Sequence, residues 1–354
     1  MKLNPNVKKN ISGFAENIKK KSEESSLNSK DNFSDYEFSG DAEYTQAMKL
    51  KSDLLKKYGG KELGEVFDGQ EVKSKEGTTY CIEDSFKCKI KKQDVENAKR
   101  TILSDFTVIK GIAEATEFKL KNQGYDTLYD LQNHEKFGHG AKKLVTCIEK
   151  EGIFGFLNNL PNNYSKSSPN ILRASKFHEL DDFIVYDIET MGLSNVPIFL
   201  FGMSYITEDE IHTKQFFARN ISEEAASLYR TVQEINQKNI LVTFNGKTFD
   251  VPRTRDRLNY YELKRPEPIQ MHYDLRYFSK RAWGNKLENC KLQTVEKELL
   301  NEYRKDDVPS YLVPDFYKTY DESKNIGPIV PVITHNKIDV VTSAKILNLL
   351  WNEW

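Results

Sequence analysis

The stretch Phe183-Ile184-Val185-Tyr186-Asp187-Ile188-Glu189-Thr190 decides the fold that we predict for this chain of 354 residues. It opens as an apolar run typical of a buried strand and ends with two carboxylates, Asp187 and Glu189. In a strand, residues i and i+2 point to the same face, so both acids would leave the edge of a core together. Two like charges so placed repel each other unless a cation lies between them. Taken alone, the pair is best interpreted as two solvated acids at the end of a strand.

The composition limits the class of protein. Hydrophobic residues make up 38% and charged residues 30%, which is typical of a globular chain with a polar surface. The formal net charge is −1, so any nucleic-acid site must come from local clusters of cations. No apolar run approaches the ~20 residues of a membrane helix, and residues 1–10 lack the apolar core of a signal peptide. We therefore expect a cytoplasmic protein without membrane contact.

The cysteines are scattered and form no Cys-x-x-Cys pair. They are Cys81, Cys88, Cys147 and Cys290. This spacing favours free thiols in a reducing compartment over disulfides. A metal site assembled from all of them in three dimensions is the alternative, although zinc ligands usually come in close pairs.

Composition and periodicity divide the chain into consecutive parts. We expect a disordered tail (1–40), a small mixed α/β segment (41–92), a mainly helical region (93–160), a linker (161–176) and an α/β domain (177–354). Within the mixed segment, the pattern predicts a helix over residues 42–58 and two or three short strands between Glu65 and Ile90.

The helical region contains a glycine turn twice. Gly111-Ile112-Ala113 precedes a helix that begins at Glu114, and Gly138-His139-Gly140 repeats the pattern. This region resembles the helix-hairpin-helix module of DNA-processing proteins. The resemblance implies that backbone N–H groups near Gly111, Gly138 and Gly140 hold phosphates. An ordinary helical bundle with glycine turns is the alternative.

After the opening strand, the pattern predicts two more strands, a helix and a fourth strand. The strands are expected at 198–206, 211–217 and 240–244, and the helix opens at Ser222. This β-β-β-α-β order matches the core of ribonuclease-H-like folds. We therefore predict a mixed sheet flanked by helices.

Two later motifs supply further acids. Asp250 stands in Asn245-Gly246-Lys247-Thr248-Phe249-Asp250-Val251-Pro252, where a turn enters a helix. His335 and Asp339 are four residues apart and would share one face of a helix. Each motif alone has an ordinary explanation, an N-cap for Asp250 and a surface pair for the other two. The order in which they follow Asp187 and Glu189 favours one common site instead.

These motifs and their order resemble the YprB-like branch of the ribonuclease-H-like, DEDD exonuclease superfamily. The phrase Asn-x-x-x-Phe-Asp-x-Pro is similar to its second motif, shared with the proofreading domains of family B DNA polymerases. The segments Asp274-Leu275-Arg276, 290–296 and 307–317 carry the closer match, which covers about Asp182 to the C-terminus. The resemblance implies metal-dependent 3′–5′ exonuclease activity on nucleic acid, with DNA favoured over RNA.

The resemblance also implies the roles of single residues. Two divalent cations, Mg²⁺ or Mn²⁺, would be held by the acids Asp187, Glu189, Asp250 and Asp339. His335 would orient or deprotonate the attacking water. The His-x-x-x-Asp spacing is that of the superfamily's tyrosine subgroup, whereas the histidine itself belongs to the other subgroup.

Cations and aromatic residues alternate between residues 247 and 286, a pattern that suits phosphate contacts and base stacking on a single strand or frayed end. The nucleic-acid contacts that we expect in this domain are Thr190, Leu193, Asn245, Arg257, Arg276, Lys280 and Arg281. Two other functions stay open. One is a structure-selective endonuclease of the same fold, and the other is a non-catalytic nucleic-acid-binding protein.

Overall fold

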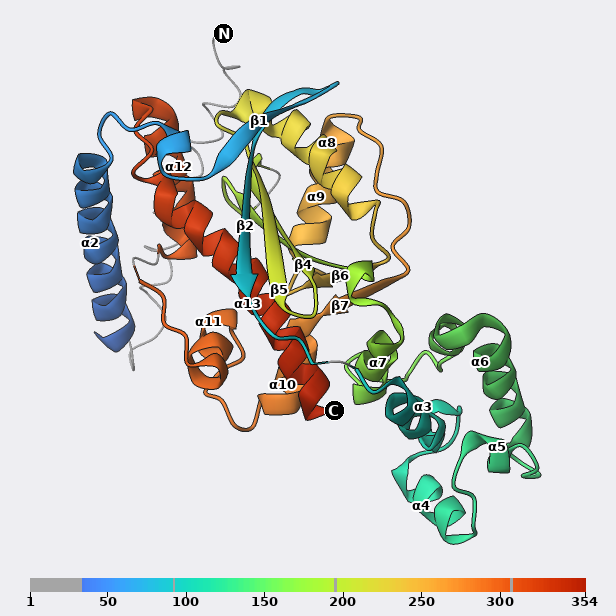
Figure 1. Ribbon diagram of the computed structural model, residues 1–354. Helices are drawn as coiled ribbons and strands as arrows, with labels where there is room; N and C mark the ends of the chain where they lie inside the picture. The colour runs from blue at the N-terminus through green and yellow to red at the C-terminus, as the bar shows by residue number, and fades with distance from the viewer. Residues whose placement is uncertain (1–33, 92, 194–195, 306–307) are drawn as a thin grey trace. The chain divides into compact units, whose positions relative to one another are not determined.

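The computed structural model describes residues 34–91, 93–193, 196–305 and 308–354 (Figure 1). The chain divides into two compact units, residues 1–53 and 54–354. The described part of the first unit is helical and belongs to α2 (Ser34–Lys57), which contains most of the helix predicted over 42–58. Most of the predicted disordered tail lies outside the described residues. Among the described residues, no helix is both long and apolar enough to span a bilayer.

A seven-stranded mixed sheet lies at the centre of the second unit, in the order β1-β2-β5-β4-β3-β6-β7. The strands are β1 (Gly69–Ser74), β2 (Gly77–Lys87), β3 (Phe183–Thr190), β4 (Ile198–Ile206), β5 (Glu210–Phe217), β6 (Ile240–Thr243) and β7 (Met271–Asp274). The pairs from β1 to β3 are antiparallel, whereas β3, β6 and β7 run parallel. The predicted mixed sheet flanked by helices is confirmed.

The first two strands change the expected division of the chain. Strands were predicted between Glu65 and Ile90, and β1 and β2 form there. They do not belong to a small segment of their own, because β2 pairs with β5 from Tyr80 to Lys87 and so extends the central sheet. The buried side chains of Tyr80 and Ile82 complete the apolar surface at this edge.

The helices that follow β1 and β2 form a second, smaller core. They are α3 (Val95–Leu103), α4 (Glu114–Asn122), α5 (Leu128–Leu131), α6 (Gly138–Asn158) and α7 (Pro169–Ala174). Phe106, Leu128, Leu131 and Phe156 are fully buried in this core. Because α7 lies inside the range 161–176, the predicted linker is partly helical.

The remaining helices pack around the sheet. They are α8 (Glu224–Ile235), α9 (Asp250–Tyr260), α10 (Leu275–Trp283), α11 (Leu292–Val295), α12 (Val313–Ser323) and α13 (Ile329–Glu353). Short turns of 3₁₀ helix occur at 63–65, 106–108, 175–177, 180–182, 221–223 and 310–312, and a π-helical turn occurs at 296–300. The long helix α13 crosses the sheet over β3, β4 and β5 (Figure 1).

Strand β3 lies inside the sheet, between β4 and β6. Its two faces pack into two different apolar cores. Phe183 and Val185 pack in one core with residues of α10 and α13. Ile184, Tyr186 and Ile188 pack in a second core with residues of α8 and α9. Alternation along the strand therefore places the two acids that follow on the face that α13 covers.

Arg257, predicted to contact nucleic acid, is buried instead, and this expectation is corrected. Its Nε and Nη2 donate to Oε1 and Oε2 of Glu224 at 2.7 and 2.6 Å. The two side chains are only 7% and 0% exposed. Glu224 also accepts hydrogen bonds from the backbone N–H of Ile198 and the hydroxyl of Tyr261. The pair joins α8 and α9 to the start of β4, so its role is structural.

We expect Arg257→Met to lower the free energy of unfolding by about 3–5 kcal/mol, because it leaves the Glu224 carboxylate buried without its counter-ion. Equilibrium unfolding in urea measures this change. The control is Arg255→Ala on the same helix, whose side chain is 55% exposed, and we expect a change within about 0.5 kcal/mol there. An Arg257→Met protein as stable as the control would contradict a structural role for the pair.

Candidate active site

The end of β3 and the middle of α13 bring three carboxylates together. Asp187 and Glu189 come from the strand, and Asp339 comes from the helix. One carboxylate oxygen of each lies within 4.8 Å of one oxygen of the others. We call these residues the carboxylate trio. Each is half-buried, so the trio keeps some access to solvent.

Asp250 lies beside the trio but is not part of it. It begins α9 and is 4% exposed. Its Oδ1 accepts the backbone N–H of Ile188 at 3.1 Å, and Ile188 stands between the two acids of β3. The structure therefore brings three of the predicted metal ligands into mutual reach and places the fourth against the backbone of β3, between Asp187 and Glu189.

Burial, together with neighbouring carboxylates, raises the pKa of Asp187, Glu189 and Asp250. Burial raises the pKa of Asp187 well above its usual range, and the charges of Asp250, Asp339 and Glu189 add to the effect. Burial is also the main reason why the pKa of Glu189 is raised to about 8 and that of Asp250 to about 7. Without further positive charge, the site therefore holds protons that ordinary carboxylates lose.

The ligand chemistry of the trio fits a hard divalent cation. All of its donor atoms are carboxylate oxygens, which suit Mg²⁺ and Mn²⁺. A cation among them would offset the repulsion that raises the pKa of Asp187 and Glu189. The residues that could hold it are the trio, with Asp250 at the next position.

His335 lies one turn before Asp339 on α13, as the spacing predicts. Its Nε2 is 3.4 Å from Oδ2 of Asp339, and the residue is 9% exposed. A pocket of about 120 Å³ lies beside His335, Thr334 and Arg304, with room for ordered water. The imidazole thus stands next to both a carboxylate of the trio and a space that water can enter.

Arg304 is a site residue that the sequence analysis missed. Its Nη2 donates to Oδ1 of Asp339 at 2.5 Å, and its Nε donates to Oε2 of Glu296 at 2.7 Å. The side chain is only 8% exposed. Arg304 belongs to no motif, and no spacing relates it to Asp339, so only the folded chain brings the two together.

Asn336 was missed as well. Its Nδ2 donates to Oδ2 of Asp187 at 2.9 Å. It stands next to His335, and the i, i+4 pattern used to connect His335 with Asp339 passes over it. No local pattern marks it, because its burial inside α13, which requires hydrogen-bond partners for the amide, appears only in the structure.

The expected contacts near the trio lie at its rim. Thr190 is buried, and its hydroxyl donates to the carbonyl of Gly192. Leu193 is 75% exposed. Asn245 adopts a left-handed conformation with φ 72°, and its Oδ1 accepts from Nη1 of Arg276 at 2.6 Å. Leu193 is thus placed on the surface and Asn245 is half-buried, whereas Thr190 stabilises the turn after β3.

The three predicted cations of α10 are exposed. They are Arg276, Lys280 and Arg281. The helix begins at Asp274, which caps it and also accepts N–H groups from Asn245 and Lys247. Asp274 thereby connects α10 to the loop that leads into Asp250. We call Arg276, Lys280 and Arg281 the α10 cations.

The glycines of the helical region have different surroundings. Gly111 has φ 92° and open space around it, as a turn that approaches a ligand requires. Gly138 lies in the first turn of α6, where a Cβ would come within 2.4 Å of the Gln132 carbonyl. Gly140 would approach Ile109 at 3.0 Å. The second glycine pair therefore serves close helix packing, and Gly111 keeps the predicted turn.

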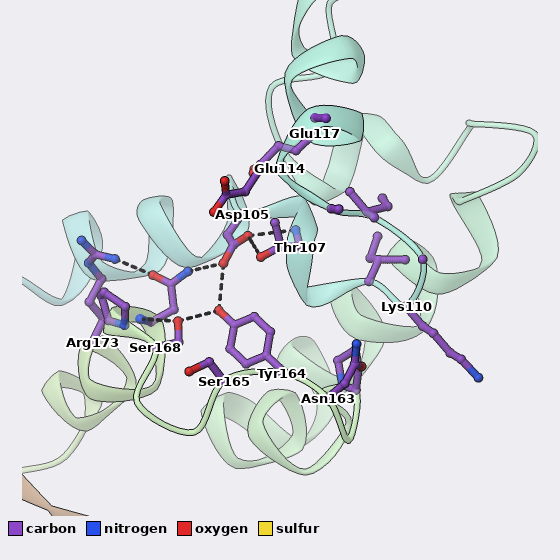
Figure 2. A pocket seen from close by; sticks show the side chains of 18 of the residues that line it. Asp105, Thr107, Lys110, Glu114, Glu117, Asn163, Tyr164, Ser165, Ser168 and Arg173 are labelled. Atoms are coloured by element: carbon purple, nitrogen blue, oxygen red, sulfur yellow. Dashed lines mark hydrogen bonds between the residues drawn. The ribbon is translucent and has the colours of Figure 1, made fainter. Parts of the chain in front are cut away.

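A pocket of about 690 Å³ lies beside the Gly111 turn and includes Arg281 in its lining. The carboxylate of Asp105 in the wall of this pocket accepts hydrogen bonds from the backbone N–H of Thr107 and, at 2.8 Å, from the hydroxyl of Tyr164 (Figure 2). It also accepts a hydrogen bond from Nδ2 of Asn170 at 2.6 Å. These bonds fasten the segment predicted as a linker to the helical region. The pocket includes none of the trio.

Comparisons with known proteins found a matching family, a relative and a similar solved structure. Residues 184–351 match the RNase_H superfamily. The chain is 29% identical over 199 residues to the uncharacterized protein YprB of Bacillus subtilis (strain 168), covering 54% of this chain and 48% of YprB. The chain thus spans about half the length of this relative. Among solved structures, the family B DNA polymerase of the hyperthermophilic archaeon Pyrobaculum calidifontis matches with 12% identity and a TM-score of 0.32, over 48% of this chain and 27% of that one.

The C-terminal region therefore matches the RNase_H superfamily and is similar to YprB, which supports the YprB-like, ribonuclease-H-like domain that its motifs predict. This family supports a nuclease fold with a divalent-metal site, and the acidic cluster is present. The helix-hairpin-helix character of residues 93–160 stays a prediction.

We expect the metal-free protein to lose stability as the pH rises. Acids whose pKa is about 8 and about 7 in the folded protein bind more protons than the unfolded chain between about pH 4 and pH 8. The free energy of unfolding therefore falls across this window, and Asp187→Asn flattens the dependence because it removes one of the repelling charges. Thermal unfolding in EDTA from pH 5.5 to 8.5 measures the effect. The control is Glu208→Gln in the exposed turn before β5; an Asp187→Asn slope equal to that of this control would contradict the expectation.

Proposed function

We propose that this ribonuclease-H-like domain is a metal-dependent 3′–5′ exonuclease that hydrolyses nucleic-acid phosphodiesters, with DNA favoured over RNA. The observation that carries the proposal is the carboxylate trio, in which β3 and α13 place three acids within 4.8 Å of one another at a half-buried edge. Acids so close are unstable together without a cation, and the superfamily of this domain supports a nuclease.

The two cations that we propose, Mg²⁺ or Mn²⁺, would supply charge stabilisation to a phosphate and lower the pKa of water, when bound. Asp187, Glu189 and Asp339 would hold one of them, and Asp187 and Asp250 would hold the other. Asp250 is already anchored by the N–H of Ile188, so its carboxylate is held in place beside β3. The fixed acids thus hold the substrate phosphate in one orientation.

His335 is proposed to take a proton from the attacking water. The water oxygen bonds to phosphorus, the bond from phosphorus to the 3′ oxygen breaks, and the released nucleotide carries a 5′ phosphate. The shortened strand keeps a 3′ hydroxyl after its oxygen gains a proton from solvent. The 3.4 Å contact with Asp339 supports this role, because a carboxylate beside Nε2 stabilises the imidazolium that forms.

The α10 cations support a strand that approaches the trio along its rim. They lie on one short helix, and Tyr277 between them is 44% exposed. Phosphate contacts together with an aromatic platform suit single-stranded or frayed ends. Asn245 and Leu193 would then border the terminal nucleotide, and the Gly111 turn would contact the strand further away.

Asp187→Asn should lower nuclease activity by ~10³-fold or more. Several kcal/mol of charge stabilisation would be lost because Asp187 is proposed to help hold both cations. A strand labelled at one end, incubated with Mg²⁺, Mn²⁺ or EDTA, measures this. EDTA should abolish the wild-type activity. The control is Asp181→Asn at the start of the domain, whose side chain is 94% exposed and which should keep full activity. Activity of Asp187→Asn equal to that of the control would refute the mechanism.

The same assay separates the alternatives. An exonuclease shortens linear single strands labelled at their 5′ end step by step and spares a circular strand, whereas a structure-selective endonuclease cuts the circle or a branched duplex. Matched RNA strands decide the substrate preference. Tight binding of DNA without cleavage in Mn²⁺ would support a non-catalytic binding protein instead.

The double variant Lys280→Glu and Arg281→Glu should bind single-stranded DNA more weakly and with a smaller dependence on salt. Each lost phosphate contact lowers the slope of log affinity against log salt by about 0.7 for single strands. Fluorescence anisotropy at several salt concentrations measures both quantities. Lys318→Glu on α12, whose side chain is 59% exposed, controls for the change in total charge. An unchanged slope in the double variant would rule out the α10 cations as phosphate contacts.

A further inference from the structure

Three neighbouring strands place Asp187, Gly202 and Gln215 in one row across the sheet. Asp187 of β3 pairs with Gly202 of β4, which in turn pairs with Gln215 of β5. Asn336 of α13 lies over this row. Its Nδ2 donates to Oδ2 of Asp187 at 2.9 Å, and its Oδ1 accepts from Nε2 of Gln215 at 2.7 Å. One buried amide thus connects an acid of the trio with a strand two positions away.

The direction of the Asn336 amide is fixed by a third partner. Nε2 of Gln215 also donates to the carbonyl oxygen of Ile333 at 2.9 Å. Because a carbonyl can only accept, the nitrogen of Gln215 must face α13, and the oxygen of Asn336 must face that nitrogen. The NH₂ group of Asn336 is therefore left for Asp187, and the amide cannot turn over without losing both bonds.

Gly202 provides the space for this arrangement. A Cβ at this position would come within 2.2 Å of Oδ1 and within 2.8 Å of Cγ of Asn336. Asn336 and Gln215 are 0% and 1% exposed, so neither side chain can move aside into solvent. Among the described residues, Oε1 of Gln215 has no hydrogen-bond partner, an arrangement that lowers stability. The unpaired Oε1 is thus a consequence of the orientation in which Nε2 of Gln215 points toward α13.

We propose that Asn336 is a positioning residue that holds Asp187 in the orientation needed to bind the divalent cation, with Gln215 and Gly202 fixing its amide. The bond to Oδ2 leaves Oδ1 of Asp187 for the ion. This inference rests on the proposed metal-dependent function and adds a residue to it.

A neutral amide suits this task better than a charged group. A lysine or arginine at the same place would compete with the cation for Asp187, and a carboxylate would add to the repulsion within the trio. The N–H of an amide steadies the ionised carboxylate and leaves the charge of the site unchanged. Hydrogen bonds of this kind, one step behind a metal ligand, typically change metal affinity 10–100-fold when they are removed.

The test measures Mn²⁺ binding to the full chain by isothermal titration calorimetry, without substrate. Asn336→Leu keeps the shape and the neutral charge of the side chain but loses the donor, so we expect its affinity for Mn²⁺ to fall 10–100-fold. The concentration of Mn²⁺ that gives half-maximal activity should rise by the same factor, with activity recovered at saturation. Asn348→Leu is the matched control on the same helix, because among the described residues its amide binds the backbone of Lys89 and Lys91, and its affinity should not change.

Gln215→Leu gives a second, independent variant. It frees the Asn336 amide to turn, so it should weaken Mn²⁺ binding less than Asn336→Leu does. Added to Asn336→Leu, it should weaken binding little further, because the two residues act as one unit. Thermal unfolding in EDTA confirms that each variant is folded before the titration.

The outcomes separate this inference from the proposed function. If Asn336→Leu binds Mn²⁺ as the wild type does while Asp187→Asn has lost binding, the positioning role is wrong and the metal site stands. If Asp187→Asn binds Mn²⁺ like the wild type, the proposed metal-dependent function is itself overturned, and the positioning role with it. Additive effects of Gln215→Leu and Asn336→Leu would show that Gln215 does not orient the amide.

Discussion

The repulsion between carboxylates at the end of β3 is the constraint on which the rest of the site depends. Alternation along a doubly buried strand sends Asp187 and Glu189 to the face that α13 covers, and the helix meets them with another acid, Asp339. Solvent cannot screen these charges well, as the raised pKa of Asp187 shows. Large apolar cores on either side of the sheet hold the strand and the helix in place despite this repulsion.

Three of the four acids of the site are each held by a separate contact. The backbone N–H of Ile188 holds Asp250, the amide of Asn336 holds Asp187, and Arg304 holds Asp339. These partners come from β3, from α13 and from the segment after the π-helical turn. The orientation of these three acids is thereby set before any cation arrives, which is the arrangement that preorganised sites use.

The features predicted correctly from the sequence are those that depend on short-range periodicity. The i, i+2 spacing in a strand and the i, i+4 spacing in a helix placed Asp187, Glu189 and Asp339 correctly on their elements. The prediction failed where partners are distant in sequence. Arg257 was assigned to the surface because its buried partner, Glu224, is 33 residues away. The role of β2 was missed for the same reason, because its pairing with β5 spans more than a hundred residues and has no local signal.

Arg304 poses the remaining question, since a fixed cation beside Asp339 ought to weaken the attraction of the site for metal ions. Glu296 resolves it. The guanidinium contacts both carboxylates, so Arg304 and Glu296 together add no net charge to the site. The acids Asp187, Glu189, Asp250 and Asp339 keep a combined charge that two divalent cations would neutralise when all four are ionised. Arg304 can therefore orient Asp339 without replacing a metal ion, in the same way that the neutral amide of Asn336 orients Asp187. Both contacts direct a carboxylate and leave its charge for the ligand.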